Sequence, residues 1–426
     1  MNRQLSTFFK EQTEHLTGST GLEHWLIESD NLPAMKALLT THSQAVDLIY
    51  IDPPYNTGHT TLAYNDRLPS HEAWIDFMRK RLLLARQLLA SDGAIFISID
   101  QHELFRLGTL CNEIFGEKNC LGIITLVNNL KGRSDGKHFA VCNEFMLAYA
   151  INAEKIHMKL ANIDEEEIDR DYQYSDGKGH YKLTGFRKTG KAWRREDRPY
   201  MYYPILWRDG QFFSIEDEEY LRIYQNGSFD DKYVEQLCYR YRQQGFLVFL
   251  PQDAHGRNGR WRWGFFDTFR KCYKTELCLN SNQTPCVKMR ARLEDGSLRG
   301  KLAKTTWYKA EYDTGTASRQ LTQILGRRMF DNPKSVDHIK DVLRLFDSNT
   351  TVLDFFAGSG TTLHAVLQLN AEDGGKRHCI LITNNEKNIC REVTLPRCQN
   401  IINGYRLPDG RMVDGLQNNC LRFFTT

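Results

Sequence analysis

The chain has 426 residues, of which 41% are hydrophobic and 26% are charged. This composition excludes a disordered protein and a small disulfide-stapled fold, and the length predicts one large domain or two unequal ones. The 56 basic and 53 acidic residues give a net charge of +3, which alone does not indicate a nucleic-acid partner.

The first part of the chain alternates between strand-like and helix-like segments. Between residues 24 and 51 the pattern predicts a short strand, a short helix and a second apolar strand. The second strand, 46–51, runs into the sequence DPPYNTG at 52–58, whose prolines and glycine force an irregular loop. Open α/β sheets bind ligands at this edge.

Further elements of the same kind follow. Ser70 is the expected N-cap of a long amphipathic helix, which should end at the sequence SDG at 91–93. A buried strand at 94–100, a helix at 103–115 and a strand at 143–150 come next. We interpret 24–150 as one half of an α/β domain, preceded by an N-terminal arm at 1–23.

The amino-acid composition of the chain changes after residue 150. An acidic run at 163–171 precedes a region rich in Tyr, Trp, Arg and Lys. Nine basic residues stand against two acids at 178–208, and twelve against four at 257–304, so the basic charge is regional. We interpret 151–320 as an inserted region.

The α/β pattern resumes near residue 350. A strand at 351–356 is followed by the loop AGSG at 357–360, a helix from Thr361 and a strand at 378–383. The last thirty residues predict a helix and a glycine-punctuated hairpin. The two α/β stretches, 24–150 and 321–426, are therefore expected to share one sheet.

The cysteines and the N-terminus exclude several protein classes. The eleven cysteines are scattered and include no C-x-x-C pair, so neither a disulfide framework nor a zinc ribbon is expected. No window approaches 18 uncharged apolar residues, and the first residues lack the pattern of a signal peptide. These features predict a cytoplasmic protein without a metal.

The string Asp52-Pro53-Pro54-Tyr55 combines a carboxylate, two rigid residues without N–H donors and an aromatic ring. Such a cluster suits a planar ligand with an NH₂ group, held by the Asp52 carboxylate and the Pro53 carbonyl while Tyr55 stacks on its face. A rigid surface turn capped by Asp52 is the alternative.

The segment from Asp354 to Thr361 ends one strand and opens a helix. Its glycines let the backbone approach a ligand, and the free N–H groups of the helix N-terminus suit an anionic or carboxylate-bearing cofactor. A nucleoside-triphosphate loop, G-x-x-x-x-G-K-[ST], would need a Lys before its hydroxyl residue, but the helix here opens Gly360-Thr361-Thr362. A plain glycine-rich turn is the other alternative.

Together the two motifs resemble those of the amino-methyltransferases of DNA, which combine a DPPY-type catalytic motif with an FxGxG motif for S-adenosylmethionine. The catalytic motif comes first, as in the permuted β-group order. The strongest likeness is to the modification (Mod) subunits of Type III restriction-modification systems, carried by LIYIDPPYNTG, DGAIFISID, FDNPKS, FAGSGTTLHAV and ITNNE. The resemblance implies a permuted Rossmann-like methyltransferase sheet with an inserted target-recognition region.

The resemblance also implies site residues. The catalytic motif falls on Asp52, Pro53, Pro54 and Tyr55. The expected cofactor contacts are Asp30, Asn31, Asp100, Lys334, Ser335, Asp354, Phe356, Ala357, Gly358, Ser359, Gly360, Thr361 and Glu386. Residues 382–385 hold the place where the family usually has a ribose-binding acid, so Glu386 is either that ligand or an acid at the start of a surface helix.

The implied activity is transfer of a methyl group from S-adenosylmethionine to the N6 amine of adenine in DNA. The base must be extruded from the duplex because its amine is otherwise out of reach. For DNA contacts we favour two segments, 188–197 and 255–264, although a solvated basic face is the alternative. Their basic residues are Lys188, Lys191, Arg194, Arg195, Arg257, Arg260 and Arg262.

Two other functions stay open. N4-cytosine methylation needs the same amine chemistry, although Ser is commoner than Asp52 in that motif. A DNA-reading subunit without catalysis is the second rival. The resemblance implies a homodimer in the bacterial cytoplasm, at the nucleoid. Since Mod subunits usually continue beyond the length of this chain, we expect either a solitary enzyme or a partner of a restriction subunit.

Overall fold

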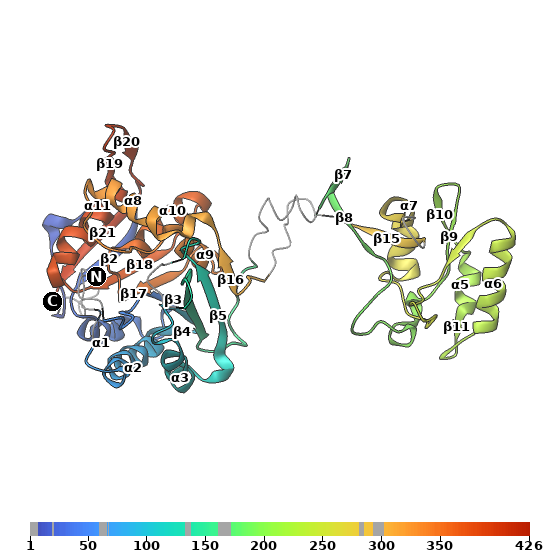
Figure 1. Ribbon diagram of the computed structural model, residues 1–426, viewed down its shortest axis with the longest axis horizontal. Helices are drawn as coiled ribbons and strands as arrows, with labels where there is room; N and C mark the ends of the chain where they lie inside the picture. The colour runs from blue at the N-terminus through green and yellow to red at the C-terminus, as the bar shows by residue number, and fades with distance from the viewer. Residues whose placement is uncertain are drawn as a thin grey trace. The chain divides into compact units, whose positions relative to one another are not determined.

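The computed structural model describes residues 7–18, 21–58, 66, 68–132, 138–160, 172–280, 285–292 and 302–426. The chain divides into two compact units, Met1–Ala161 with Leu302–Thr426, and Asn162–Lys301 (Figure 1). Residues 302–320, expected in the insertion, belong to the first unit. The reason is that β16 (Thr306–Tyr308) pairs in parallel with β5 (Cys120–Val127) of that unit.

The first unit is built on one ten-stranded sheet with the order β1-β21-β2-β18-β17-β3-β4-β6-β5-β16. Its central strands are β2 (Leu22–Glu28), β18 (His378–Thr383), β17 (Thr351–Asp354), β3 (Val46–Ile51) and β4 (Leu89–Ile99), and they run parallel to one another. β6 (Asn143–Ala150) runs antiparallel to β4 and β5. The pairing of β3 with β17 confirms that the two α/β stretches share a sheet.

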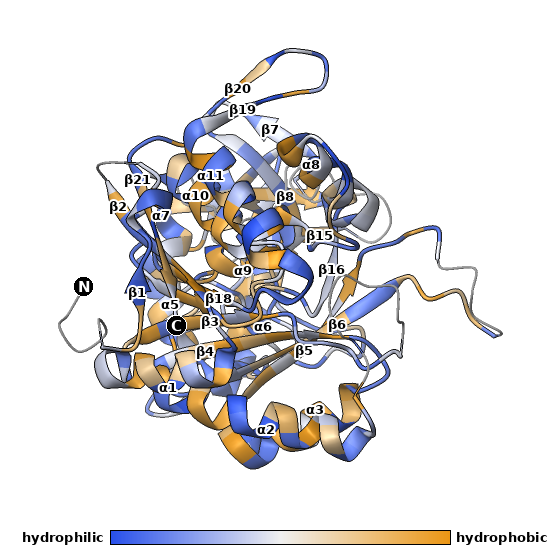
Figure 2. Ribbon diagram, turned by 90° about the vertical axis from the view of Figure 1, so that its left-hand side faces the viewer, coloured by the Kyte–Doolittle hydropathy of each residue, from blue (hydrophilic) through white to orange (hydrophobic). Residues whose placement is uncertain are grey.

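Helices cover both faces of this sheet (Figure 1). One face carries α1 (Asn31–His42), α2 (His71–Leu88) and α3 (Leu104–Phe115), and the other carries α8 (Thr314–Leu325), α9 (Val336–Arg344), α10 (Thr361–Asp373) and α11 (Leu395–Asn403). In β3, Leu48 and Tyr50 face the core under α9 and α10, whereas Ile49 and Ile51 face the core under α1 and α2. Burial on both faces explains the apolar runs at 48–51 in β3 and 94–97 in β4 (Figure 2).

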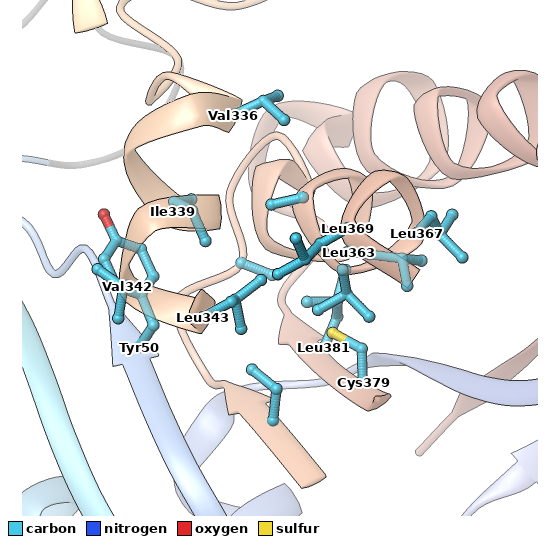
Figure 3. Close-up of a cluster of buried hydrophobic side chains, with 14 of the residues drawn as sticks. Tyr50, Val336, Ile339, Val342, Leu343, Leu363, Leu367, Leu369, Cys379 and Leu381 are labelled. Atoms are coloured by element: carbon cyan, nitrogen blue, oxygen red, sulfur yellow. The ribbon is translucent and has the colours of Figure 1, made fainter. Parts of the chain in front are cut away.

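The core under α9 and α10 sets the position of the glycine loop. Figure 3 shows Ile339 and Leu343 of α9 and Leu363 of α10 gathered over Leu381 of β18. α10 starts at the residue after Gly360, so its packing fixes the loop that joins it to β17.

One local expectation differs from the structure, and two are confirmed. The sequence SDG at 91–93, expected to lie between a helix and a strand, lies inside β4. β4 has more residues than β3 between the pairs Val46–Leu89 and Leu48–Ala94, and an irregular register accommodates them. The predicted C-terminal hairpin, β19 (Gly404–Arg406) with β20 (Met412–Asp414), follows α11. A strand is also expected at the sequence NCLRFFTT, and β21 (Asn419–Thr425) lies there. It pairs in parallel with β2, and β1 (Lys10–Glu11) of the N-terminal arm adds to its other edge.

The second unit has its own aromatic core, which includes Tyr203, Trp261, Phe265 and Phe269. One sheet has the order β14 (Leu277–Asn280), β15 (Cys286–Arg292), β8 (Gly179–Gly185) and β7 (Tyr174–Asp176), and another has β10 (Gln211–Ser214), β9 (Ile205–Arg208) and β13 (Leu247–Phe249). Its helices are α5 (Asp217–Ile223), α6 (Asp231–Gln243) and α7 (Arg270–Glu276). Within the described ranges of the chain, no helix combines the length and apolar character that a membrane span requires.

Candidate active site

Two cavities lie at the carboxyl edge of the parallel strands. The larger, of about 290 Å³, is lined by residues that follow β2, β18, β17 and β3. The smaller, of about 100 Å³, is lined from β3, β4, β5 and β6. Asp52 and Lys334 line both cavities, so the loop after β3 separates two spaces and faces each of them.

Most of the predicted cofactor residues line the larger cavity. They are Asp30, Asn31, Lys334, Asp354, Phe356, Ala357, Gly358, Ser359, Thr361 and Glu386. Gly360 belongs to the same loop but is not among the lining residues. Its φ of 78° is left-handed, and a Cβ there would lie 3.1 Å from Thr394 Cγ2, so the position requires glycine.

Asp354 and Arg397 fix the shape of the glycine loop. The Asp354 carboxylate accepts hydrogen bonds from the Phe356 N–H at 2.9 Å and from the Thr362 hydroxyl at 2.5 Å. Burial raises the pKa of Asp354 to about 7. Arg397, which is fully buried, donates to the Ser359 hydroxyl at 3.0 Å and the Thr361 hydroxyl at 2.7 Å. The loop is therefore braced from both ends.

Asp30 and Asn31 reach the same cavity from the end of β2. Asp30 caps α1 by accepting the Leu32 N–H at 2.9 Å. Asn31 donates to the Phe355 carbonyl at 2.9 Å and accepts from Arg81 Nε at 2.6 Å. Because both polar ends of its amide are used within the protein, Asn31 acts on the cavity by holding the glycine loop. Arg81 is a lining residue that no sequence pattern indicated.

The loop at 52–58 carries the predicted catalytic residues and is called the catalytic loop. It is held by a buried acid. The Asp66 side chain accepts the backbone N–H groups of Tyr55 at 2.7 Å, Asn56 at 3.1 Å and Thr57 at 3.0 Å. The Pro54 carbonyl accepts from the Trp74 indole N–H at 2.7 Å. These bonds give the string at 52–55 a fixed shape, as its prolines predicted.

Lys334 joins the catalytic loop to β6. Its Nζ lies 3.2 Å from Asp52 Oδ1, 2.7 Å from Glu144 Oε2 and 2.6 Å from the Tyr55 hydroxyl oxygen. The Tyr55 hydroxyl in turn donates to Glu144 Oε2 at 3.1 Å. One ammonium group thus stands between two carboxylates, and the Tyr55 ring is fixed by its hydroxyl. Asp52 Oδ1 is buried with the Lys334 ammonium as its partner, while Glu144 Oε1 is buried and accepts no hydrogen bond from the described residues.

Burial and charge compete within this cluster. Burial raises the pKa of Asp52, the Lys334 ammonium opposes that rise, and the Glu144 carboxylate adds to it. Burial alone would lower the pKa of Lys334, but the carboxylates of Asp52 and Glu144 outweigh it and raise that pKa. Lys334 is therefore a cation at neutral pH and favours the ionised form of Asp52.

The smaller cavity holds two residues that were expected at the cofactor. Asp100 lies there because β4 adds to the sheet on the side of β3 away from β17, and its carboxylate accepts the His102 N–H at 2.9 Å. Ser335 also lines this cavity, where its hydroxyl caps α9 and donates to the Glu311 carbonyl at 2.8 Å. Both residues are used locally rather than at the larger cavity.

His338 is a further polar residue of the smaller cavity. Its side chain is fully buried, and neither ring nitrogen bonds to a described residue. Burial lowers the pKa of His338 to about 4, so the ring is neutral at physiological pH. Nothing in the sequence indicated a role for Glu144 or His338. Glu144 lies in a segment that predicted only a strand, and His338 lies in α9, a helix that was not predicted.

The two basic segments favoured for DNA contact meet in the second unit. Lys188 N–H donates to the Arg260 carbonyl at 2.9 Å, and the Arg260 N–H donates to the Trp193 carbonyl at 3.0 Å. Lys191, Arg194, Arg257 and Arg262 are exposed, while Lys188 is half-buried. The two segments therefore lie side by side in that unit.

Four of the predicted DNA contacts have partners within the second unit. Arg257 Nε lies 2.7 Å from Asp253 Oδ2 and Arg262 Nε donates to the Gly185 carbonyl at 2.9 Å, although both side chains stay exposed. Arg195 and Arg260 are less exposed. The Arg195 guanidinium forms a pair with the Asp231 carboxylate, with Nη2 2.9 Å from Oδ2, and lies 4.3 Å from the Phe229 ring centre. Arg260 is 8% exposed, and its Nε donates to the Ala192 carbonyl at 2.7 Å. A basic residue count does not distinguish such side chains from exposed ones.

Comparisons with known proteins agree with this geometry. A family model described as DNA methylase matches residues 46–394. The chain is 32% identical over 395 residues to the Mod subunit of the Type III restriction-modification enzyme EcoPI from Escherichia phage P1, covering 85% of this chain and 58% of that protein. It is 31% identical over 366 residues to the Type II methyltransferase M.KpnI from Klebsiella pneumoniae, covering 84% of this chain and 79% of that protein. Among solved structures, the cytosine-N4-specific PvuII DNA methyltransferase aligns at 8% identity with a TM-score of 0.43, over 90% of this chain and 89% of that one.

Proposed function

Because the chain belongs to the DNA methylase family, we propose that it transfers a methyl group from S-adenosylmethionine to the N6 amine of an adenine extruded from duplex DNA. The observation that carries this proposal is the place of Asp52 between the two cavities, with its carboxylate 3.2 Å from the Lys334 ammonium, which favours the ionised form. A methyl donor in the larger cavity and an amine in the smaller one would meet at this carboxylate.

The lining of the larger cavity fits S-adenosylmethionine. The N-terminus of α10 offers backbone N–H groups to a carboxylate, and Asp30 and Glu386 offer oxygen atoms to hydroxyl or amino groups. Phe77 and Phe356 add aromatic surface. When bound, S-adenosylmethionine supplies a methyl group on a sulfonium centre.

In the smaller cavity, Asp52 addresses the main chemical difficulty of the reaction. The lone pair of an exocyclic amine is delocalised into its ring, so the amine is a poor nucleophile. Accepting its two protons with Asp52 and the Pro53 carbonyl favours a pyramidal nitrogen whose lone pair is free to attack. These fixed acceptors also stabilise the positive charge that develops on nitrogen as the N–C bond forms and the S–C bond breaks. The surplus N6 proton then passes to the Asp52 carboxylate and from there to water. Tyr55 provides the stacking surface for the extruded base.

The proposal is tested by incubating the protein with methyl-labelled S-adenosylmethionine and bacterial genomic DNA, then identifying the labelled base after hydrolysis. We expect N6-methyladenine from the wild type, none from Asp52→Asn, and unchanged yield from Asp76→Asn, which alters an exposed acid of α2. Labelled N4-methylcytosine would favour the cytosine activity. Absence of label with bound S-adenosylmethionine would favour a subunit that reads DNA without catalysis.

The second unit is proposed to recognise the target sequence. Support comes from Lys191, Arg194, Arg257 and Arg262, the exposed basic residues of the two adjoining segments, here called the basic surface of this unit. Exposed Arg and Lys side chains bind phosphates and guanine edges. Single-molecule sequencing of DNA from cells that produce the protein would give the methylated sequence. Variants that remove the charge of these four residues should lower methylation at that sequence.

The assembly is also a proposal. The relative from phage P1 is a Mod subunit, and the chain spans 58% of its length. We propose that the protein is a homodimer that acts at the bacterial nucleoid, either alone or as a Mod subunit with a restriction partner. Light scattering at micromolar concentration tests the dimer, and a monomer would contradict it. Co-purification from the native host tests the restriction partner.

A further inference from the structure

A groove of about 590 Å³ runs along α8. Its lining includes Thr314, Ser318, Thr322 and Gln323, which are neutral and polar, and two arginines, Arg319 and Arg328. Arg319, Gln323 and Arg328 are exposed. No acidic residue lines the groove within the described part of the chain.

The groove is continuous with the proposed catalytic site. Thr314 lines both the groove and the smaller cavity. Asn332 lines the groove and both cavities. A chain molecule lying in the groove would therefore pass the mouth of the cavity that contains Asp52.

The two sides of α8 differ in chemistry. Ala317, Leu321 and Ile324 are buried against the first unit, and the helix sequence TGTASRQLTQIL contains no acid. Asp313 caps the helix by accepting the Thr316 N–H at 3.0 Å, and Asp331 pairs with Arg328 at 2.9 Å. The Thr322 hydroxyl donates to the Ser318 carbonyl at 2.8 Å. The open side thus presents mainly the Gln323 amide and the guanidinium groups of Arg319 and Arg328. These are the groups that contact phosphate oxygens in protein–DNA complexes.

We propose that this groove binds the sugar-phosphate backbone of the DNA strand that carries the extruded nucleotide. The inference rests on the proposed function and adds a DNA-binding surface in the first unit, separate from the basic surface of the second. An extruded nucleotide stays covalently joined to its neighbours, so the backbone on either side must lie at the mouth of the smaller cavity. The α8 groove begins at that mouth and has the complementary charge.

The test uses the full-length protein and two duplexes of about 30 base pairs and mixed sequence, one fully paired and one with a central adenine opposite an abasic site. Affinity is measured by fluorescence anisotropy over a range of salt concentrations. The variant is Arg319→Ala with Arg328→Ala. The control is Arg411→Ala, because Arg411 is 76% exposed and pairs with Asp409 at 2.7 Å, much as Arg328 is 70% exposed and pairs with Asp331.

On the duplex with the abasic site, the slope of log K against log[salt] should fall by about 0.9 for each phosphate that the variant no longer binds, or about two in the double variant. The fall should be smaller on the paired duplex, and the control should match the wild type. An unchanged slope, an equal fall on both duplexes or an equal fall in the control would overturn the groove assignment. Melting curves and S-adenosylmethionine binding show whether each variant is folded. Methyl transfer by the wild type is measured separately, and its absence would refute the proposed function without deciding the groove.

Discussion

Lys334 and Glu144 should shift the pH dependence of methyl transfer in opposite directions. Lys334→Met removes the cation beside Asp52, and Glu144→Gln removes the negative charge on the far side of that cation. Asp52 must be ionised to accept the protons of the amine, so its pKa sets the acid limb of kcat/KM in the free enzyme. Loss of the cation raises the pKa of Asp52, and loss of the second carboxylate lowers it.

The separation of 3.2 Å between Lys334 Nζ and Asp52 Oδ1 gives the size of the first effect. With an effective dielectric constant of about 20, the attraction is about 5 kcal/mol. In Lys334→Met, water that enters beside the Asp52 carboxylate will stabilise its charge and offset part of the lost attraction. We therefore expect the acid limb of this variant to move up by about 1–3 pH units. Glu144→Gln should move it down by less, since Glu144 affects Asp52 more weakly than Lys334 does.

Other charged or titratable groups surround Asp52 and also influence the pH dependence of kcat/KM. They are Tyr50, Tyr55, Asp66, Asp100, His338 and Asp354. Each stays in place in both variants, so only the sign of the removed charge differs between them. Initial rates are measured with labelled S-adenosylmethionine between about pH 5 and 9. Lys340→Met is the matched control, because Lys340 is a buried lysine of α9 that pairs with Glu372 at 2.6 Å outside both cavities. If the acid limb moved in the same direction in both variants, the reasoning would be refuted, because that is the result expected from a general loss of packing.

Three further predictions concern the supports of the site and the second unit. Asp66→Ala should lower kcat by about 100-fold with little change in S-adenosylmethionine affinity by calorimetry, because it frees the catalytic loop only; an equal loss of cofactor affinity would contradict this. Gly360→Ala should lower the free energy of unfolding, measured in urea, by about 2–4 kcal/mol. The control Gly374→Ala should lower it by only about 1–2 kcal/mol, because Gly374 also has a positive φ but has open space around it. Arg195→Ala should lower the melting temperature, whereas Arg194→Ala should weaken DNA binding at an unchanged melting temperature; the reverse pattern would show that Arg195 is the DNA contact.

Contiguous motifs made part of the site predictable. Asp52 and the glycine loop each follow an apolar strand directly, so a local pattern places them at the carboxyl edge of a sheet. Glu144 could not be found in this way. Its partner Lys334 is 190 positions away in the sequence, and the contact exists only because β6 is inserted antiparallel beside β4. Arg195 shows the opposite error, since a basic residue in a basic segment can be fully engaged by an acid such as Asp231 from another helix.

The order of the strands explains the division of labour between the two cavities. β3 lies between β17 on one side and β4 on the other. The chain reaches β17 only after the long insertion, while β4 follows β3 directly, so the sheet grows in both directions from the catalytic strand. Open α/β sheets bind ligands where the strand order reverses in this way. Asp52, at the end of β3, therefore faces a glycine loop on one side and the acids of β4 and β6 on the other. Asp100 falls on the second side for the same reason, which is why an acid expected at the cofactor lies instead in the cavity proposed for the base.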